Sequence, residues 1–201
     1  MSAPSRSRVP AAQRREELVE AAVAEFARGG LHGTAVGEIA RRVGVAQPYV
    51  FSLFASKREL FLAASARGFE RVEATFREAI AAYERGEAPP EVDGPLKAMG
   101  LAYVEMVRSD RDALMLQHQS YAACGDPEVA AHVRQLFARL VETARELATA
   151  SGGDARVGEE EMDEFVRQGM ACNVAAALDV EDLSIGSDWI AAERGAATAT
   201  D

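Results

Sequence analysis

The chain has 201 residues, 48% of them hydrophobic, and carries 22 basic and 32 acidic side chains, a formal net charge of -10. This length suits one domain of ordinary size, or a small domain fused to a larger one. Taken whole, the acidic charge argues against a nucleic-acid-binding protein. The charge is unevenly distributed, however, because residues 1–60 have a net charge of +3 and residues 61–201 one of -13. We therefore expect a basic functional end on an acidic body.

The cysteine content and the hydropathy pattern indicate the cellular compartment. Cys124 and Cys172 are too few for a disulfide scaffold, which favours a reducing cytoplasm. No apolar run approaches the ~20 residues needed to span a bilayer. Residues 1–10 lack the apolar stretch of a signal peptide. The sequence thus predicts a cytoplasmic protein without membrane association, beginning with a flexible basic arm at 1–11.

The spacing of apolar residues predicts an all-α fold. Stretches rich in Ala, Leu, Glu and Arg carry apolar residues three and four positions apart, and no segment shows the alternation of a strand. In chain order we expect a helix ending at Gly29-Gly30, helices at 35–43 and 47–54, a long helix from Lys57 that ends before Pro89, one from Pro95 to Ser109, one at 112–123, one starting at Asp126-Pro127-Glu128, and a last one after Ser151-Gly152-Gly153. Residues 195–201 are predicted to be disordered.

Two short helices separated by Gly44 predict a helix-turn-helix. In the first, Val36, Ile39, Ala40 and Val43 share an inward face, and in the second Val50 and Phe54 do so. The other residues of the second helix cannot all be core; they are Gln47, Pro48, Tyr49, Ser52 and Leu53. Such a helix can enter the major groove of DNA, where Gln reads adenine and Tyr or Ser bonds phosphates or base edges.

Several short motifs in this segment resemble the TetR family of bacterial transcription regulators. They are Ile39-Ala40, Gly44-Val45, Phe51-Ser52-Leu53-Phe54 and Ser56-Lys57-Arg58-Glu59-Leu60, within a match over about residues 12–62. The resemblance implies a homodimer with three-helix DNA-binding heads, a helical ligand pocket, and repression released when a small molecule binds. It implies an N-terminal helix-turn-helix domain at 12–56, followed by a helical ligand-binding and dimerisation domain at 57–194.

The resemblance also assigns roles to individual residues. Gln47, Pro48, Tyr49 and Ser52 stand where the family contacts DNA, while Lys57 and Thr34 stand where it contacts phosphates. Three positions depart from the family's pattern. Many members have Thr or Ser in place of Ala35, Tyr in place of Phe51 and His in place of Leu53, and each departure removes a polar contact worth ~1 kcal/mol. The departures put individual phosphate contacts in doubt, but not the fold.

Apolar and polar residues of the body could line a ligand pocket. The candidates are Met99, Tyr103, Met106, Gln117, His118, Tyr121, Phe137 and Phe165. Met tolerates irregular apolar shapes, and Gln117 and His118 would supply polar anchors. The alternative is that the apolar members are ordinary core residues.

A second set of residues on the last two helices suggests a dimer interface. The candidates are Val133, Leu136, Leu140, Phe165, Gly169, Met170, Asn173 and Ala177. Small residues permit close approach, so a pair of helices from each subunit could form a four-helix bundle. Asn173 on that face would need a partner, such as its counterpart across a two-fold axis. The alternative is that the two helices pack within one chain.

These features predict a ligand-responsive, sequence-specific DNA-binding regulator, a repressor released by an unknown small molecule. Its partners would be a pseudo-palindromic double-stranded operator and a second copy of itself. The alternative is a helical ligand-binding or interaction protein that no longer engages DNA. We expect no enzyme, cofactor or metal site, because the sequence has no phosphate-binding glycine loop, nucleophile elbow or spaced metal-ligand set.

Overall fold

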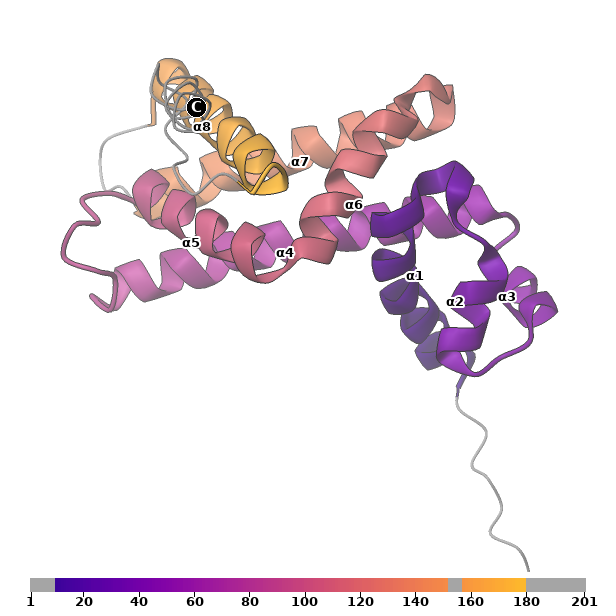
Figure 1. The fold of residues 1–201 in the computed structure, drawn as a ribbon. Coiled ribbons are helices and arrows are strands. Elements are labelled where there is room, and N and C mark those ends of the chain that lie inside the picture. Colours follow the sequence, from indigo (N-terminus) through magenta and orange to yellow (C-terminus); the bar gives the residue numbers. More distant parts are fainter. Residues whose placement is uncertain (1–9, 152–156, 180–201) are drawn as a thin grey trace, which may run out of the picture. The chain divides into compact units, whose positions relative to one another are not determined.

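A computed structural model of the chain describes residues 10–151 and 157–179, and this part of the chain is helical without strands (Figure 1). The expected arm at 1–11 falls almost wholly outside the described residues, and the expected tail at 195–201 does so entirely. The elements are α1 (Ala11–Gly33), α2 (Val36–Val43), α3 (Gln47–Leu53), α4 (Lys57–Glu84), α5 (Pro95–Ser109), α6 (Arg111–Ala122), a 3-10 turn (Ala123–Gly125), α7 (Pro127–Ser151) and α8 (Glu159–Ala177). The predicted all-α class is confirmed.

Helix α1 continues one turn beyond its expected end. Gly30 has φ 62° and ψ -175°, so the regular helix does stop there, but the chain resumes a helical turn that reaches Gly33. Residues with a side chain avoid this positive φ. A side chain at Gly30 would also collide with Oε1 of Gln119 in α6. Gly30 therefore permits the kink and leaves room for the Gln119 side chain.

Helix α7 starts where the sequence predicts. Oδ1 of Asp126 accepts hydrogen bonds from the main-chain N–H groups of Glu128 (2.9 Å) and Val129 (3.3 Å). These bonds satisfy two of the N–H groups that lack a partner in the first turn of a helix. Arg58 of α4 forms ion pairs with the carboxylates of Asp126 and Glu128.

The chain divides into two compact units, Met1–Arg71 with Asp112–Leu140, and Val72–Arg111 with Val141–Asp201. We call them unit 1 and unit 2. The first part of α4, nearly all of α6 and the first part of α7 thus belong to the same unit as the helix-turn-helix. The apolar cluster of unit 1 contains Phe26 of α1, Ile39 of α2, Val50 of α3, Phe61 of α4, Leu116 of α6 and Val133 of α7. The core of the helix-turn-helix therefore continues past residue 56.

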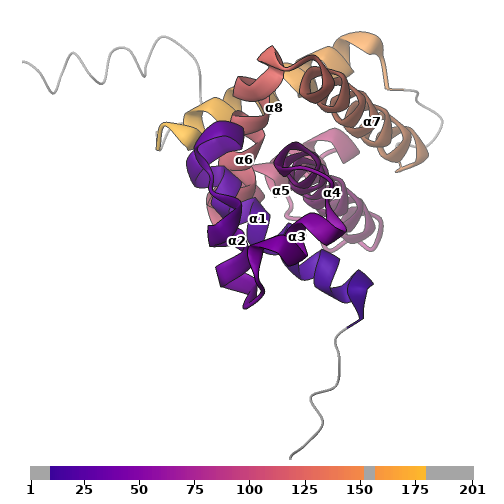
Figure 2. The same cartoon turned by 90° about the vertical axis from the view of Figure 1, so that its right-hand side faces the viewer.

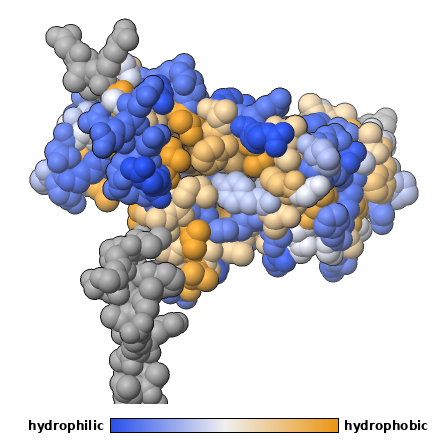
Figure 3. Space-filling model, turned by 90° about the horizontal axis from the view of Figure 1, so that it is seen from above, coloured by the Kyte–Doolittle hydropathy of each residue, from blue (hydrophilic) through white to orange (hydrophobic). Residues whose placement is uncertain are grey.

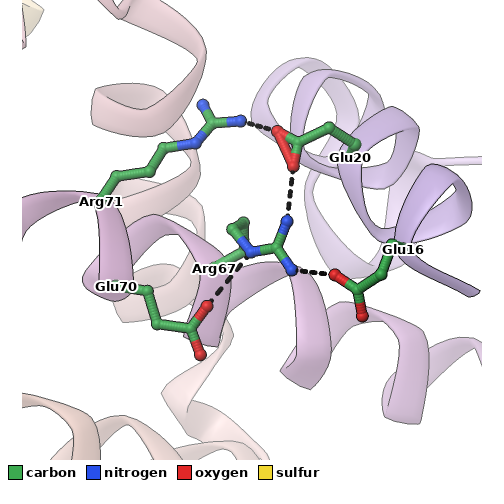
Figure 4. Close-up of polar contacts among 5 residues, drawn as sticks. All are labelled: Glu16, Glu20, Arg67, Glu70 and Arg71. Atoms are coloured by element: carbon green, nitrogen blue, oxygen red, sulfur yellow. Dashed lines mark hydrogen bonds and ion pairs between the residues drawn. The ribbon is translucent and has the colours of Figure 1, made fainter. Parts of the chain in front are cut away.

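Charged side chains join α1 to α4 on the surface of unit 1. Arg67 of α4 bonds to Glu16 and Glu20 of α1 and to Glu70 of its own helix, and Arg71 bonds to Glu20 (Figure 4). These contacts, first of all the hydrogen bond with Glu16, raise the pKa of Arg67. Exposed ion pairs contribute little singly, but a network holds its members in one arrangement.

Unit 2 has an aromatic cluster between α4, α5 and α8. The ring of Phe76 lies 6.3 Å from that of Tyr103 and 5.7 Å from that of Phe165, measured between centroids. Nδ2 of Asn173, which is fully buried, donates a hydrogen bond to Oη of Tyr103 at 2.9 Å. Burial raises the pKa of Tyr103. Among the residues the structure describes, none of the helices is long and apolar enough to cross a membrane.

Candidate nucleic-acid interface

Helices α2 and α3 form the predicted helix-turn-helix. Gly44 ends α2 in the left-handed region, at φ 74° and ψ 34°. The main-chain N–H of Val45 then donates to the carbonyl oxygen of Ala40 at 2.9 Å, which closes the turn. Ile39 and Ala40 are buried at 0% and 2% exposure, so α2 packs firmly in the head. We use the word head for α1, α2 and α3 together (Figure 2).

One side of α3 faces the core and the other faces solvent. Val50 is buried at 1% exposure, as is Phe54 directly after the helix, and Leu53 is half-buried. The exposed residues of α3 are Gln47, Pro48, Tyr49, Phe51 and Ser52. The hydroxyl of Ser52 donates to the carbonyl oxygen of Tyr49 at 2.7 Å. Four of these exposed residues are predicted DNA contacts, and their exposure leaves them accessible to a groove.

Lys57 connects the start of α4 to the end of α1. Its Nζ atom donates to the carbonyl oxygen of His32 at 2.9 Å, and burial lowers the pKa of the half-buried ammonium group. An ammonium group has three N–H donors, so this bond leaves capacity for a phosphate oxygen. The phosphate contact of Lys57 stays a prediction.

Thr34 has a role that differs from the expected one. Its residue is only 7% exposed, and its hydroxyl donates to the carbonyl oxygen of Glu25 at 3.0 Å. Gly29 makes room for it, because a Cβ at Gly29 would lie 2.7 Å from Oγ1 of Thr34. The side chain thus links the segment between α1 and α2 to the main chain of α1. It is buried, so it is not presented at the surface as a hydrogen-bond donor to a phosphate.

Most basic side chains of residues 10–60 are engaged within the chain. Residues 10–60 hold seven basic and six acidic side chains, so the described part of this region is nearly neutral. The ion pairs are Arg14 with Glu17, Arg28 and Arg42 with Glu25, Arg41 with Glu38, and Arg58 with Asp126 and Glu128. The guanidinium carbon of Arg15 lies 4.5 Å from the centroid of the Phe54 ring, a cation–π contact that the sequence pattern did not reveal. The described part of this region therefore presents little net positive charge.

The segment that contains the helix-turn-helix matches a known protein family. Residues 18–64 match the family model described as "Bacterial regulatory proteins, tetR family". The helix-turn-helix of this chain is thus similar to that of the TetR family. The matched residues cover the last part of α1, the whole helix-turn-helix and the beginning of α4, so the predicted resemblance is confirmed.

Curated proteins similar to this chain include a transcriptional activator and a transcriptional repressor. The chain is 26% identical over 147 residues to the transcriptional activator FasR of Mycolicibacterium smegmatis, covering 73% of this chain and 64% of FasR. It is 30% identical over 138 residues to the transcriptional repressor KstR of Rhodococcus jostii, covering 64% of this chain and 60% of KstR. The chain therefore spans somewhat less than two thirds of each relative.

The fold is also found in solved structures. The transcriptional regulator FadR of Bacillus subtilis, solved in complex with stearoyl-CoA, matches with a TM-score of 0.63 at 14% sequence identity. The match covers 83% of this chain and 89% of that FadR chain. At this identity the likeness concerns the fold alone.

The predicted ligand-pocket residues fall in both units of the chain. Gln117, His118, Tyr121 and Phe137 belong to unit 1, and Met99, Tyr103, Met106 and Phe165 belong to unit 2. In unit 1, Nε2 of Gln117 donates to Oη of Tyr121 at 2.8 Å. In unit 2, Met99 and Tyr103 are buried at 0% and 7% exposure, as core residues would be. Their role in binding a ligand stays a prediction.

The predicted dimer-interface residues are largely covered within the single chain. Val133, Leu136 and Leu140 of α7 are buried, and Nδ2 of Asn173 of α8 donates to Oη of Tyr103 within the chain, while the role of these residues in a dimer stays a prediction. The other α8 candidates are half-buried; they are Phe165, Gly169, Met170 and Ala177. The α8 residue Val174 and the following Leu178 have large exposed apolar side chains, and the sequence pattern did not single them out as interface residues. On the face drawn in Figure 3, hydrophobic residues lie in patches between hydrophilic ones.

Proposed function

We propose that this chain is a sequence-specific transcriptional regulator that binds double-stranded DNA as a homodimer in the cytoplasm. The observation that carries the proposal is the solvent-facing side of α3, where Gln47, Pro48, Tyr49 and Ser52 are exposed while Val50 is buried. A core-packed helix that offers polar and aromatic side chains to solvent, after a tight turn, is the arrangement that reads a major groove.

Two copies of the head related by a two-fold axis would read a pseudo-palindromic operator. The half-sites would be separated by one turn of B-DNA, ~34 Å, or by multiples of it. The near-neutral charge of residues 10–60 supports a dimeric reader, since a single head offers few free cations to attract phosphates. Gln47 would read adenine, Tyr49 and Ser52 would contact base edges or phosphates, and Lys57 would contact a phosphate.

The proposed regulator responds to a small molecule that binds in its helical body and releases DNA, so that it acts as a repressor. A coupling free energy of ~1 to 3 kcal/mol between the two sites would lower DNA affinity substantially. The relative KstR is a repressor, which supports repression by this chain, whereas the relative FasR is an activator. A long-chain acyl-CoA is the first compound to test, because the structurally similar FadR was solved with stearoyl-CoA.

Gel-shift titrations of the full chain against genomic fragments at fixed salt test the proposal. A fragment containing a pseudo-palindrome should bind far more tightly than random DNA of the same length, and affinity should fall steeply as salt rises. Addition of the effector should release the fragment. If no fragment binds better than random DNA, the proposal is wrong.

The second candidate is a helical ligand-binding protein whose helix-turn-helix no longer engages DNA. The departures at Ala35, Phe51 and Leu53 favour it, because each takes a polar contact away from the predicted interface. The salt series separates the two functions. A protein that does not engage DNA would show weak, sequence-independent binding throughout.

A further inference from the structure

Phe51 is an exposed apolar residue on the helix that is proposed to read DNA. It is 44% exposed, although its neighbour Val50 is buried at 1% exposure. Single exposed apolar residues are ordinary on protein surfaces, so exposure alone carries little weight. The location is informative, however. Among the described residues, the aromatic side chains that are large, hydrophobic and exposed are Tyr49 and Phe51, and both lie in α3.

The position of Phe51 on α3 pairs it with Gln47. Residues four apart lie on the same side of a helix, so Phe51 follows Gln47 along one flank, and Ser52 follows Pro48 along the middle of the exposed side. Four residues rise by ~6 Å, and successive bases of one DNA strand are ~3.4 Å apart. On a helix lying along the major groove, Phe51 would therefore meet bases about two steps from those that Gln47 reads.

The chemistry of Phe51 restricts what it can recognise there. A phenyl ring has neither a hydrogen-bond donor nor an ordinary acceptor, so it forms no conventional hydrogen bond with a phosphate or with the polar edge of a base. Each base pair presents a distinct pattern in the major groove, and the apolar group in that pattern is the 5-methyl of thymine. Phe51 lacks the hydroxyl of the Tyr that many TetR-family members have at this position. A contact with the thymine methyl group needs no hydroxyl, so Phe51 is suited to it.

We propose that Phe51 contacts the 5-methyl group of a thymine in each half-site, about two base steps from an adenine read by Gln47. This inference rests on the proposed function and makes it more specific. The contact makes Phe51 a specificity-determining residue. It also predicts that replacing this thymine by uracil, which changes only the methyl group, weakens binding by about fourfold per half-site, roughly the effect of leaving one methyl group in water.

The experiment is a uracil scan on an operator selected from random DNA with the full chain. Each thymine is replaced in turn by deoxyuridine in both half-sites, and affinity is measured for the wild type, Phe51→Ala, Phe51→Tyr and Leu101→Ala. Leu101 lies in α5 and is 43% exposed, so it is a matched control for loss of an exposed apolar side chain. Thermal unfolding of each variant checks that the fold is kept.

Discrimination of thymine from uracil at one position per half-site is expected for the wild type, Phe51→Tyr and Leu101→Ala. Phe51→Ala should bind the two operators equally well at that position. If Phe51→Ala keeps the discrimination, or if uracil is tolerated at every position by the wild type, the role of Phe51 is wrong while the proposed function stands. If Phe51→Ala loses the same affinity for all sequences, the proposed role is also wrong, because an equal loss would indicate a contact with the sugar–phosphate backbone. Failure of the selection to enrich any sequence would instead overturn the proposed function.

Discussion

The ammonium group of Lys57 donates a hydrogen bond to the carbonyl oxygen of His32 at 2.9 Å, which fastens the first residue of α4 to the last turn of α1. A side chain held in this way cannot move freely. If it also contacts a phosphate, that phosphate is positioned relative to both helices. The contact would fix the register of the head on DNA without reading its sequence.

Replacement of Lys57 should weaken binding to every DNA sequence alike. Lys57→Ala removes both the charge and the bond to His32, whereas Lys57→Gln keeps an N–H donor for the carbonyl and removes the charge alone. Both variants should reduce the slope of log affinity against log salt by about 1 for each phosphate that is no longer neutralised. Fluorescence anisotropy over a salt series measures the slope. An unchanged slope in Lys57→Gln would show that Lys57 serves only to join the two helices.

Gly37→Ala should change sequence preference without harming the fold. A Cβ at Gly37 of α2 would lie 3.1 Å from Oε1 of Gln47, so the Gln47 side chain has to shift by a few tenths of an ångström. Ala itself favours the helix by up to ~1 kcal/mol relative to Gly. We expect an unchanged or higher melting temperature and a smaller penalty for replacing the adenine that Gln47 reads.

Gly33→Ala is the control for this substitution, because a Cβ at Gly33 has nothing within 4 Å. It should leave the adenine preference as in the wild type, and Gln47→Ala should abolish it. Identical selected sequences for Gly37→Ala and the wild type would show that the position of Gln47 does not matter for reading.

Thr34→Val should lower stability and leave the salt dependence of DNA binding unchanged. The substitution removes the hydroxyl that bonds to the carbonyl oxygen of Glu25 but keeps the shape of the side chain. Loss of this bond should cost about 1 kcal/mol in the free energy of unfolding, measured by urea denaturation, and Thr34→Ser should recover most of it. If Thr34→Val has an unchanged free energy of unfolding but a smaller slope of log affinity against log salt, Thr34 contacts a phosphate instead.

The Glu25 carboxylate should stabilise the head in a pH-dependent way. Hydrogen bonding to Arg28, and then to Arg42 of α2, lowers its pKa from the ordinary value of 4.5 despite partial burial. A carboxyl whose pKa is lowered by folding stabilises the native state above its unfolded pKa, and this contribution disappears as the pH falls through the folded pKa. Because Arg28 and Arg42 are exposed, solvent weakens the two ion pairs, and Glu25→Gln should lower the free energy of unfolding by at most about 1 kcal/mol near neutral pH.

The measurement for Glu25 is urea denaturation of the wild type and Glu25→Gln between about pH 3 and pH 7. The difference in the free energy of unfolding should shrink below pH 4.5 and vanish at the acid end. A difference that stays constant across this range would mean that the charge of Glu25 contributes nothing to the head.

The helix-turn-helix could be predicted because its evidence is local. Val50 on α3 and Phe54 directly after it are four residues apart and both buried, and Gly44 marks the turn. Asp126 and Pro127 likewise predict the start of α7 from adjacent residues alone. In each case a short stretch of sequence carries the whole physical reason for the structure.

Features that depend on distant parts of the chain could not be predicted in this way. Thr34 is buried because the carbonyl of Glu25, nine residues earlier, meets its hydroxyl, and its position before α2 did not reveal this. The apolar cluster of unit 1 includes Leu116 and Val133, which are far from the helix-turn-helix in sequence. The bond from Nδ2 of Asn173 to Tyr103, which is 70 residues earlier, could not be predicted for the same reason.

Selection of binding sites from random DNA with the full chain tests the central claim most directly. Repeated rounds at fixed salt should enrich a pseudo-palindrome whose half-sites are one helical turn, ~34 Å, or a multiple of it apart. Lys57→Ala should select the same sequence with lower affinity, and Gln47→Ala should select a different one. Enrichment of no sequence, or of a single half-site without a symmetric partner, would contradict a dimeric, sequence-specific regulator.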